Sequence, residues 1–126
     1  MKKSISTQKA PAAIGPYSQA VEVNGMLFLS GQLAIDPETG KLVDGGITEQ
    51  TMQVFRNIEA ILNEAGYTFS DVVKTTCLLG SMSDFKAMND VYGKYFQDEK
   101  PARAAFAVRE LPLGALIEIE TIAVKQ

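Results

Sequence analysis

The last quarter of the chain, residues 101–126, contains two strand patterns that place charged side chains among apolar ones. In the first pattern two sets of residues alternate with a period of two, as in a strand with two different sides. One set is Arg103, Ala105, Ala107 and Arg109, and the other is Ala104, Phe106 and Val108. In the second pattern Ile117 and Ile119 point one way, opposite Glu118, Glu120, Ile122 and Val124. A side that mixes carboxylates with Ile and Val is not purely solvated, so each charge on it needs a partner.

The connection Leu111-Pro112-Leu113-Gly114 predicts that these two strands form a tight hairpin. In that register Arg103 lies opposite Ile122, Glu118 lies opposite Ala107, and all four share one side of the sheet. Arg103 and Glu118 would then stand roughly 13 Å apart at about 3.3 Å per residue. They could meet directly only in a shifted register, or serve one pocket if a ligand or a second copy of the chain fills the gap.

The remaining patterns predict one α+β domain over residues 1–126. Asn24-Gly25 between two apolar runs is a strong hairpin signal. The expected strands are Lys3–Ser6, Ala20–Val23, Met26–Ser30 and a central Val72–Gly80; the expected helices run from Thr48 to Ala65 and from Ser83 or Asp84 to Phe96. The result is two layers, a mixed sheet with both helices on one face. The other face needs a cover, and self-association supplies one economically.

Composition excludes several kinds of chemistry. The chain has no histidine and a single cysteine, Cys77, so imidazole-based triads, the usual zinc sites and internal disulfides are all excluded. A net charge of −3 disfavours nucleic acid as a partner, because that affinity rests on clustered Lys and Arg. No segment has the apolar length of a membrane span or of a secretion signal, so we expect a cytoplasmic protein that does not enter membranes.

Several single residues allow two interpretations. Tyr17 either pins the loop of residues 10–19 to the core or holds its hydroxyl over a pocket. Ser30-Gly31 is either a bulge at a strand end or a point of close approach to a ligand. Asn89 is either a surface amide or a polar group aimed at a site. For Cys77 we expect a small buried side chain. Asn57 lies beside the apolar stripe of its helix and is predicted to face solvent.

Five short motifs resemble those of the RidA family, also called YjgF, whose members are imine and enamine deaminases. They are Ala13-Ile14-Gly15-Pro16-Tyr17-Ser18-Gln19, Ser30-Gly31-Gln32, Asn89-Asp90-Val91-Tyr92, Pro101-Ala102-Arg103 and Ile117-Glu118-Ile119-Glu120. Each motif is weak alone, but together they cover nearly the whole chain in the family's order and spacing.

The resemblance implies a chorismate-mutase-like fold and a homotrimer with clefts between its subunits. It also implies hydrolysis of 2-imino acids, or of their enamine tautomers, to 2-keto acids and ammonia, without metal or cofactor. Pyridoxal-phosphate enzymes release such intermediates. The family's carboxylate-binding arginine corresponds to Arg103 and its water-positioning glutamate to Glu118. Its other pocket positions correspond to Tyr17, Ser30, Gly31 and Asn89.

One position departs from the family pattern. Many members have a cysteine two residues after the arginine, where this chain has Ala105. A mechanism that needs that thiol is therefore excluded, and Cys77 lies too far away in the sequence pattern to be assumed a substitute. The hydrolysis itself requires no thiol.

Three other interpretations stay open at this stage. The chain could be a non-catalytic module that binds 2-keto acids in the same cleft. It could be an RNA-cleaving translation inhibitor, although its acidic charge and lack of histidine disfavour this. Finally, Arg103 and Glu118 could form an interface ion pair without any chemistry.

Overall fold

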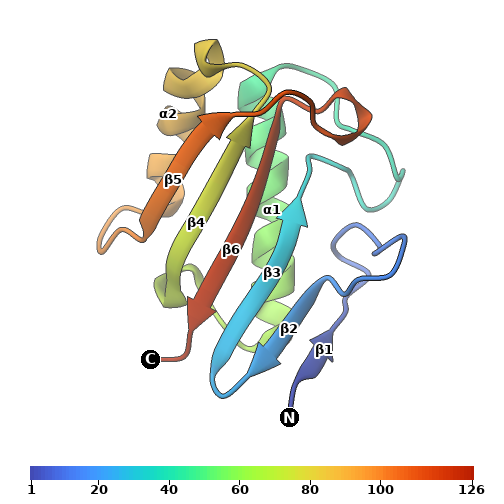
Figure 1. The fold of residues 1–126 in the computed structure, drawn as a ribbon, viewed down its shortest axis with the longest axis vertical. Coiled ribbons are helices and arrows are strands. Elements are labelled where there is room, and N and C mark those ends of the chain that lie inside the picture. Colours follow the sequence, from blue (N-terminus) through green and yellow to red (C-terminus); the bar gives the residue numbers. More distant parts are fainter.

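The structure, a computed structural model, describes residues 1–126 and contains one six-stranded mixed sheet and two helices (Figure 1). The strands occur in the order β1-β2-β3-β6-β4-β5 across the sheet. The strands are β1 Lys3–Ile5, β2 Ala20–Val23, β3 Met26–Gln32, β4 Val72–Leu79, β5 Ala102–Ala107 and β6 Ile117–Val124. The helices are α1 Ile47–Ala65 and α2 Phe85–Tyr95, and short 3-10 turns occupy Phe69–Asp71, Met82–Asp84 and Pro112–Gly114.

Both helices lie on the same face of the sheet, behind it in Figure 1, which confirms the predicted two-layer α+β architecture. The apolar stripe of α1 packs on β3 and β6, and α2 packs beside α1. The core between the layers is aliphatic toward β3 and aromatic toward α2, where Phe55 stacks on Tyr95 at 4.4 Å between ring centroids. Neither helix combines the length and apolar character that crossing a bilayer requires.

The predicted hairpin between the last two strands is wrong, because β4 lies between them. β4 pairs with β5 in parallel and with β6 antiparallel, so β5 and β6 have no ladder in common. Residues 108–116 cross the end of β4 instead of turning tightly. Val108 N donates to Leu79 O, Gly80 N donates to Leu116 O, and Pro112–Gly114 forms a 3-10 turn in this crossing. The apolar run of β4 gains a partner on both edges, as a central strand requires.

The sequence predicted the C-terminal end of α1 correctly but misplaced its N-terminal cap. Gly66 has φ 82° and ends the helix as expected. The expected cap Thr48 lies inside the first turn, and Gly46 is the cap residue instead. Its backbone N–H donates to Glu49 Oε1 at 2.8 Å, so the helix begins with a side chain reaching back from its first turn.

Asn57 of α1 is buried, contrary to the expectation that it faces solvent; only 1% of its surface is exposed. Its Nδ2 donates to the carbonyls of Leu33 and Ile35 at 3.0 and 2.9 Å, and its Oδ1 accepts from Gln53 Nε2 at 2.9 Å. The loop after β3 covers this face of the helix and supplies the carbonyls that a buried amide needs. Asn57 therefore fixes the chain immediately after β3.

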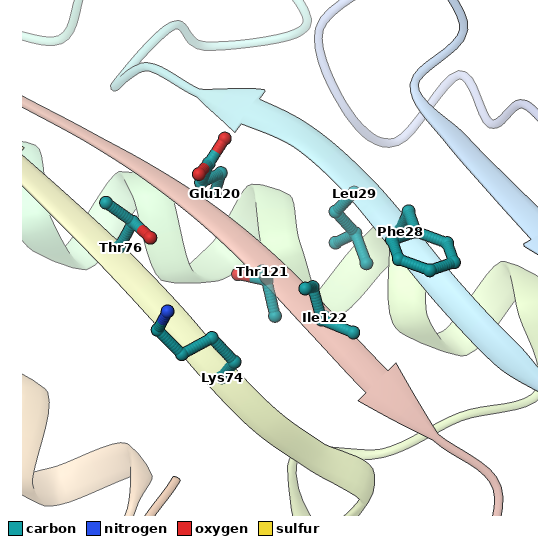
Figure 2. Close-up of a pocket in the computed structure, with 7 residues that line it drawn as sticks. All are labelled: Phe28, Leu29, Lys74, Thr76, Glu120, Thr121 and Ile122. Carbon is teal, nitrogen blue, oxygen red and sulfur yellow. The ribbon is translucent and has the colours of Figure 1, made fainter. Parts of the chain in front are cut away.

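The face of the sheet opposite the helices carries apolar side chains without a cover. Phe28 and Phe106 are exposed by 39% and 47%. A hollow of about 220 Å³ opens between β3, β6 and β4 on this face, and Figure 2 shows its lining. The lining residues are Phe28, Leu29, Lys74, Thr76, Glu120, Thr121 and Ile122.

Candidate active site

Arg103 and Glu118 project from opposite faces of the sheet. Arg103 pairs in register with Thr75, whose side chain is buried beneath the helices, and partners across a ladder point to the same side. Glu118 pairs with Leu78, which points to the opposite side of β4 from Thr75. The prediction that both lie on one side of the sheet is therefore wrong. A shift of one residue in register exchanges the two faces of a strand, and the crossing of residues 108–116 introduces that shift.

Neutral groups of α2 surround the Arg103 guanidinium. Its Nη1 donates to Asn89 Oδ1 at 2.7 Å, and its Cζ lies 4.7 Å from the Tyr92 ring centroid and 5.5 Å from that of Phe85. The one ion pair in the chain joins Lys86 to Asp90, so Arg103 has no carboxylate partner. An exposed guanidinium with free N–H donors and no counter-charge can bind a carboxylate through two parallel hydrogen bonds.

A hollow of about 320 Å³ lies beside this guanidinium, between α2 and the start of β5. Its lining residues are Asn89, Tyr92, Gly93, Phe96, Lys100, Pro101 and Arg103. Asn89 therefore lines the hollow beside Arg103 and directs its amide oxygen at the guanidinium. We refer to this region, with Phe85, as the arginine half-site.

The open face holds a second group of predicted residues around Glu118. An open hollow of about 490 Å³ is lined by Tyr17, Ser30, Gly31, Leu33, Pro112, Glu118 and Glu120. We call it the glutamate half-site. Four of the predicted site residues, Tyr17, Ser30, Gly31 and Glu118, meet here, and none of them lines the hollow beside Arg103.

A bulge in β3 places the glutamate half-site. Leu29 pairs with Thr121, but Gln32 pairs with Ile119, so Ser30 and Gly31 together oppose one residue of β6. A Cβ atom on Gly31 would lie 2.8 Å from Glu118 Cδ and closer still to Oε2. The carboxylate of Glu118 thus rests on the bare Cα of Gly31. The interpretation of Ser30-Gly31 as a bulge is confirmed, and the close approach that Gly31 permits here is that of the Glu118 side chain.

Ser30 connects the loop of residues 10–19 to this half-site. Its Oγ donates to Ser18 O at 2.6 Å, and its backbone N–H donates to Gln19 O at 3.0 Å. Gln19, which is buried, ties the same loop to Thr7 and Pro11. Tyr17, held in the loop, leaves 53% of its surface exposed, so it does not pin the loop to the core.

Burial of Glu118 raises the pKa of its carboxyl above the ordinary value of 4.5, and the nearby charge of Glu120 raises it further. A carboxylate with a raised pKa is a better proton acceptor near neutral pH. No group of three or more Cys, Asp or Glu side chains is arranged to hold a metal ion.

Comparison with known proteins identifies the family. The model of the family described as Endoribonuclease L-PSP matches residues 7–125. A 2-iminobutanoate/2-iminopropanoate deaminase of Mus musculus is 53% identical over 125 residues, which cover 99% of this chain and 93% of that protein. The chain belongs to the RidA (YjgF) family.

Solved structures of Rid proteins have the same fold. A Rid family protein of Yersinia pestis has a TM-score of 0.96 at 48% identity, covering 98% of this chain and 99% of that one. TdcF of E. coli, solved with bound serine, has a TM-score of 0.94 at 38% identity, covering 98% and 99%. The expected Rid fold is confirmed.

Ala105, which stands where many Rid family members have a cysteine, has the cysteine Cys77 as its neighbour on the next strand. Cys77 on β4 pairs in register with Ala105 on β5, so the two side chains are adjacent on the helix-facing side. The sequence pattern gave no reason to assume Cys77 as a substitute for the missing thiol, yet the fold places it beside Ala105. However, Cys77 is fully buried, and burial raises the pKa of its thiol to about 11 although Arg103 and Thr75 lower it. A buried, protonated thiol is a poor nucleophile.

Some residues of the two half-sites were not predicted from the sequence. Phe85 and Tyr92 were not among the predicted site residues, yet their rings face Arg103. Their spacing with Asn89, four and three residues apart, places all three on one helix face and could have indicated this. Glu120 and Pro112 also line the glutamate half-site, and no local sequence pattern indicated this.

Proposed function

We propose that this chain hydrolyses 2-imino acids, or their enamine tautomers, to 2-keto acids and ammonia, using clefts formed between copies of the chain in a homotrimer. The deaminase names of relatives that match over nearly the full length support the reaction. One observation carries the assignment of the site: an uncompensated guanidinium, Arg103, suited to the substrate's carboxylate. Tyr17, Ser30, Gly31 and Asn89 line the cleft in this proposal, together with Ala105.

The substrate's carboxylate accepts two hydrogen bonds from Arg103, and this fixes the plane of the C=N group. Glu118 accepts a proton from a water molecule as the water oxygen bonds to the imine carbon, and the C=N electron pair moves to nitrogen. Glu118 returns this proton to the nitrogen, which gives a carbinolamine. It then accepts the proton of the carbinolamine hydroxyl and passes it to the nitrogen, so the C–N bond breaks, ammonia leaves and the carbonyl forms. Such proton transfer accelerates a reaction by roughly two to four orders of magnitude.

A second copy of the chain is needed for this chemistry. Arg103 and Glu118 of one chain point away from each other across the sheet. The apolar side chains on the open face favour a neighbouring copy as their cover. A copy docked there brings its arginine half-site to the glutamate half-site of the first.

The reaction is tested by generating 2-iminopropanoate or 2-iminobutanoate with a dehydratase and following its decay with and without the protein. The wild type accelerates the decay, Arg103→Ala abolishes the acceleration, and Arg103→Lys retains only part of it because lysine does not fix the carboxylate plane. A decay rate equal to that of buffer alone would overturn the proposal and would favour the alternative, a non-catalytic module that binds 2-keto acids. Cleavage of RNA by thoroughly purified protein would instead favour the activity named in the family's description.

Sharing of the cleft between copies is tested by mixing two inactive variants, Arg103→Ala and Glu118→Gln, after unfolding and refolding them together. If each cleft takes its arginine and its glutamate from different copies, random mixing restores about a quarter of the wild-type rate. Recovery of no activity would place both groups in one chain. The cytoplasmic location stays a prediction.

A further inference from the structure

The Arg103 guanidinium is held without any negative charge. Phe85, Asn89 and Tyr92 project from one face of α2, and they contribute two aromatic rings and one amide oxygen. A carboxylate partner would compete with a bound anion for the same N–H donors. Aromatic faces attract the cation without occupying those donors, which stay available at the edge of the guanidinium.

Tyr92 is the better-fixed of the two rings. It is buried, and its ring packs against Phe96 at 4.8 Å and against Phe55 at 5.7 Å between centroids. Phe85 is only half-buried and packs against no other aromatic ring. The guanidinium also lies closer to Tyr92, so this ring determines where the charge sits.

A single hydrogen bond ties Tyr92 to the sheet. Its hydroxyl lies 2.7 Å from Thr75 Oγ1, in a buried pair. Thr75 is the register partner of Arg103 on the neighbouring strand. Thr75 is therefore connected to Arg103 in two ways, through the Tyr92 ring and through the β4–β5 ladder.

We propose that Tyr92 is a positioning residue for Arg103, and that Thr75 holds the Tyr92 ring in the place where it orients the guanidinium before an anion arrives. This inference rests on the proposed function, since it assigns to Arg103 the carboxylate of a 2-imino or 2-keto acid. Orientation in advance lowers the entropy lost on binding. Removing either hydroxyl breaks the hydrogen bond that ties the ring to the sheet, and removing the ring takes away the nearest aromatic contact of the guanidinium.

The variants Tyr92→Phe, Thr75→Val and Tyr92→Leu test this, with titration of pyruvate by calorimetry and with KM and kcat for 2-iminopropanoate. We expect Tyr92→Phe and Thr75→Val each to raise the Kd for pyruvate and the KM about two- to fivefold. The double variant gains nothing further, because both changes break the same bond. Tyr92→Leu raises both constants about tenfold.

A purely structural role of Tyr92 predicts different readouts. Pyruvamide, which lacks the carboxylate, should bind equally to the wild type and to all three variants, because it makes no ion pair with Arg103. The matched control is Tyr67→Phe, which removes another tyrosine hydroxyl whose hydrogen bond, to Glu22, is also 2.7 Å long. This control loses stability but keeps the pyruvate Kd. NMR of labelled arginine should show hindered guanidinium rotation that Tyr92→Leu releases.

Unchanged pyruvate Kd and KM in folded Tyr92→Phe and Thr75→Val would overturn the inference even if Arg103→Ala abolishes activity. Parallel losses for pyruvate and pyruvamide would also overturn it, because they indicate general damage to the cleft. If the wild type fails to accelerate imine decay, the proposed function falls while the pyruvate titration still decides the role of Tyr92. Tyr92→Phe keeps the ring in the core, so the test survives if Tyr92→Leu does not fold.

Discussion

The Glu118 carboxylate lies against the Cα atom of Gly31, in space that any side chain at position 31 would occupy. β3 bulges at this point and β6 runs beside it, so both backbones are fixed by their ladders. The only part free to move is the Glu118 side chain. Gly31 thus determines where the carboxylate is placed.

Gly31→Ala should therefore displace Glu118 and lower kcat by roughly 10²- to 10⁴-fold, the loss expected for a general base. Binding of pyruvate through Arg103 should persist. The matched control is Gly80→Ala, where an added Cβ meets no atom closer than 3.7 Å. Wild-type kcat in Gly31→Ala, measured in the dehydratase-coupled assay, would contradict the placement.

The raised pKa of Glu118 should appear in the pH dependence of the rate. Glu118 must be deprotonated to accept a proton, so kcat/KM should fall toward acid with a midpoint above 4.5. Burial is the main cause, and Glu120 adds to it. Replacing Glu120 by Gln removes a like charge, so the midpoint should move to lower pH. A midpoint that moves upward, or stays in place, would show that Glu120 does not act on Glu118.

The same pKa shift should destabilise the folded chain at neutral pH. Because the folded pKa lies above the unfolded one, the folded state binds more protons between them. The free energy of unfolding therefore falls as pH rises through the folded pKa. Glu118→Gln should raise Tm at pH 7 and lose this advantage at pH 4, as thermal melts at both values can measure. Equal changes at both pH values would attribute the gain to something other than charge.

Asn57→Leu should destabilise the protein by about 2–4 kcal/mol, because it leaves the carbonyls of Leu33 and Ile35 buried without a donor. The control is Asn63→Ala on the exposed face of the same helix, which should change stability by less than about 0.5 kcal/mol. Urea unfolding measures both. A loss below 1 kcal/mol for Asn57→Leu would mean that water replaces the amide.

A charge on the open face should separate the copies of the chain. Phe28→Glu introduces a carboxylate on the face that also carries Glu120, in the hollow of Figure 2. The proposed homotrimer has three times the 13.7 kDa mass of the chain, and we expect Phe28→Glu to lower the sedimenting mass to that of a single chain, with loss of activity. Met82→Glu is the control, since Met82 is an apolar side chain that is also exposed, in the turn before α2. A trimer that survives Phe28→Glu would place the contact elsewhere.

Local sequence patterns predicted most elements of the fold. The Asn24-Gly25 turn forms, with φ of 52° and 75°, because those residues tolerate positive φ. Gly66 ends α1, and β4 lies inside the sheet as its β-branched run indicated. The alternation along β6 is also as predicted, with Ile117 and Ile119 buried and Glu120 exposed. Each of these depends on neighbours a few residues apart.

The sequence by itself determined the residue types available for chemistry: the chain has no histidine and one cysteine, and the family resemblance pointed to Arg103 and Glu118 among its charged residues. Only the tertiary structure decided that these two residues lie on opposite faces, that Cys77 lies beside Ala105, and that Gly31 supports Glu118. The physical reason is that strand periodicity gives the alternation of side chains but not which strand becomes the neighbour. The insertion of β4 between β5 and β6 is a long-range pairing, and one residue of register in such a pairing exchanges the two faces.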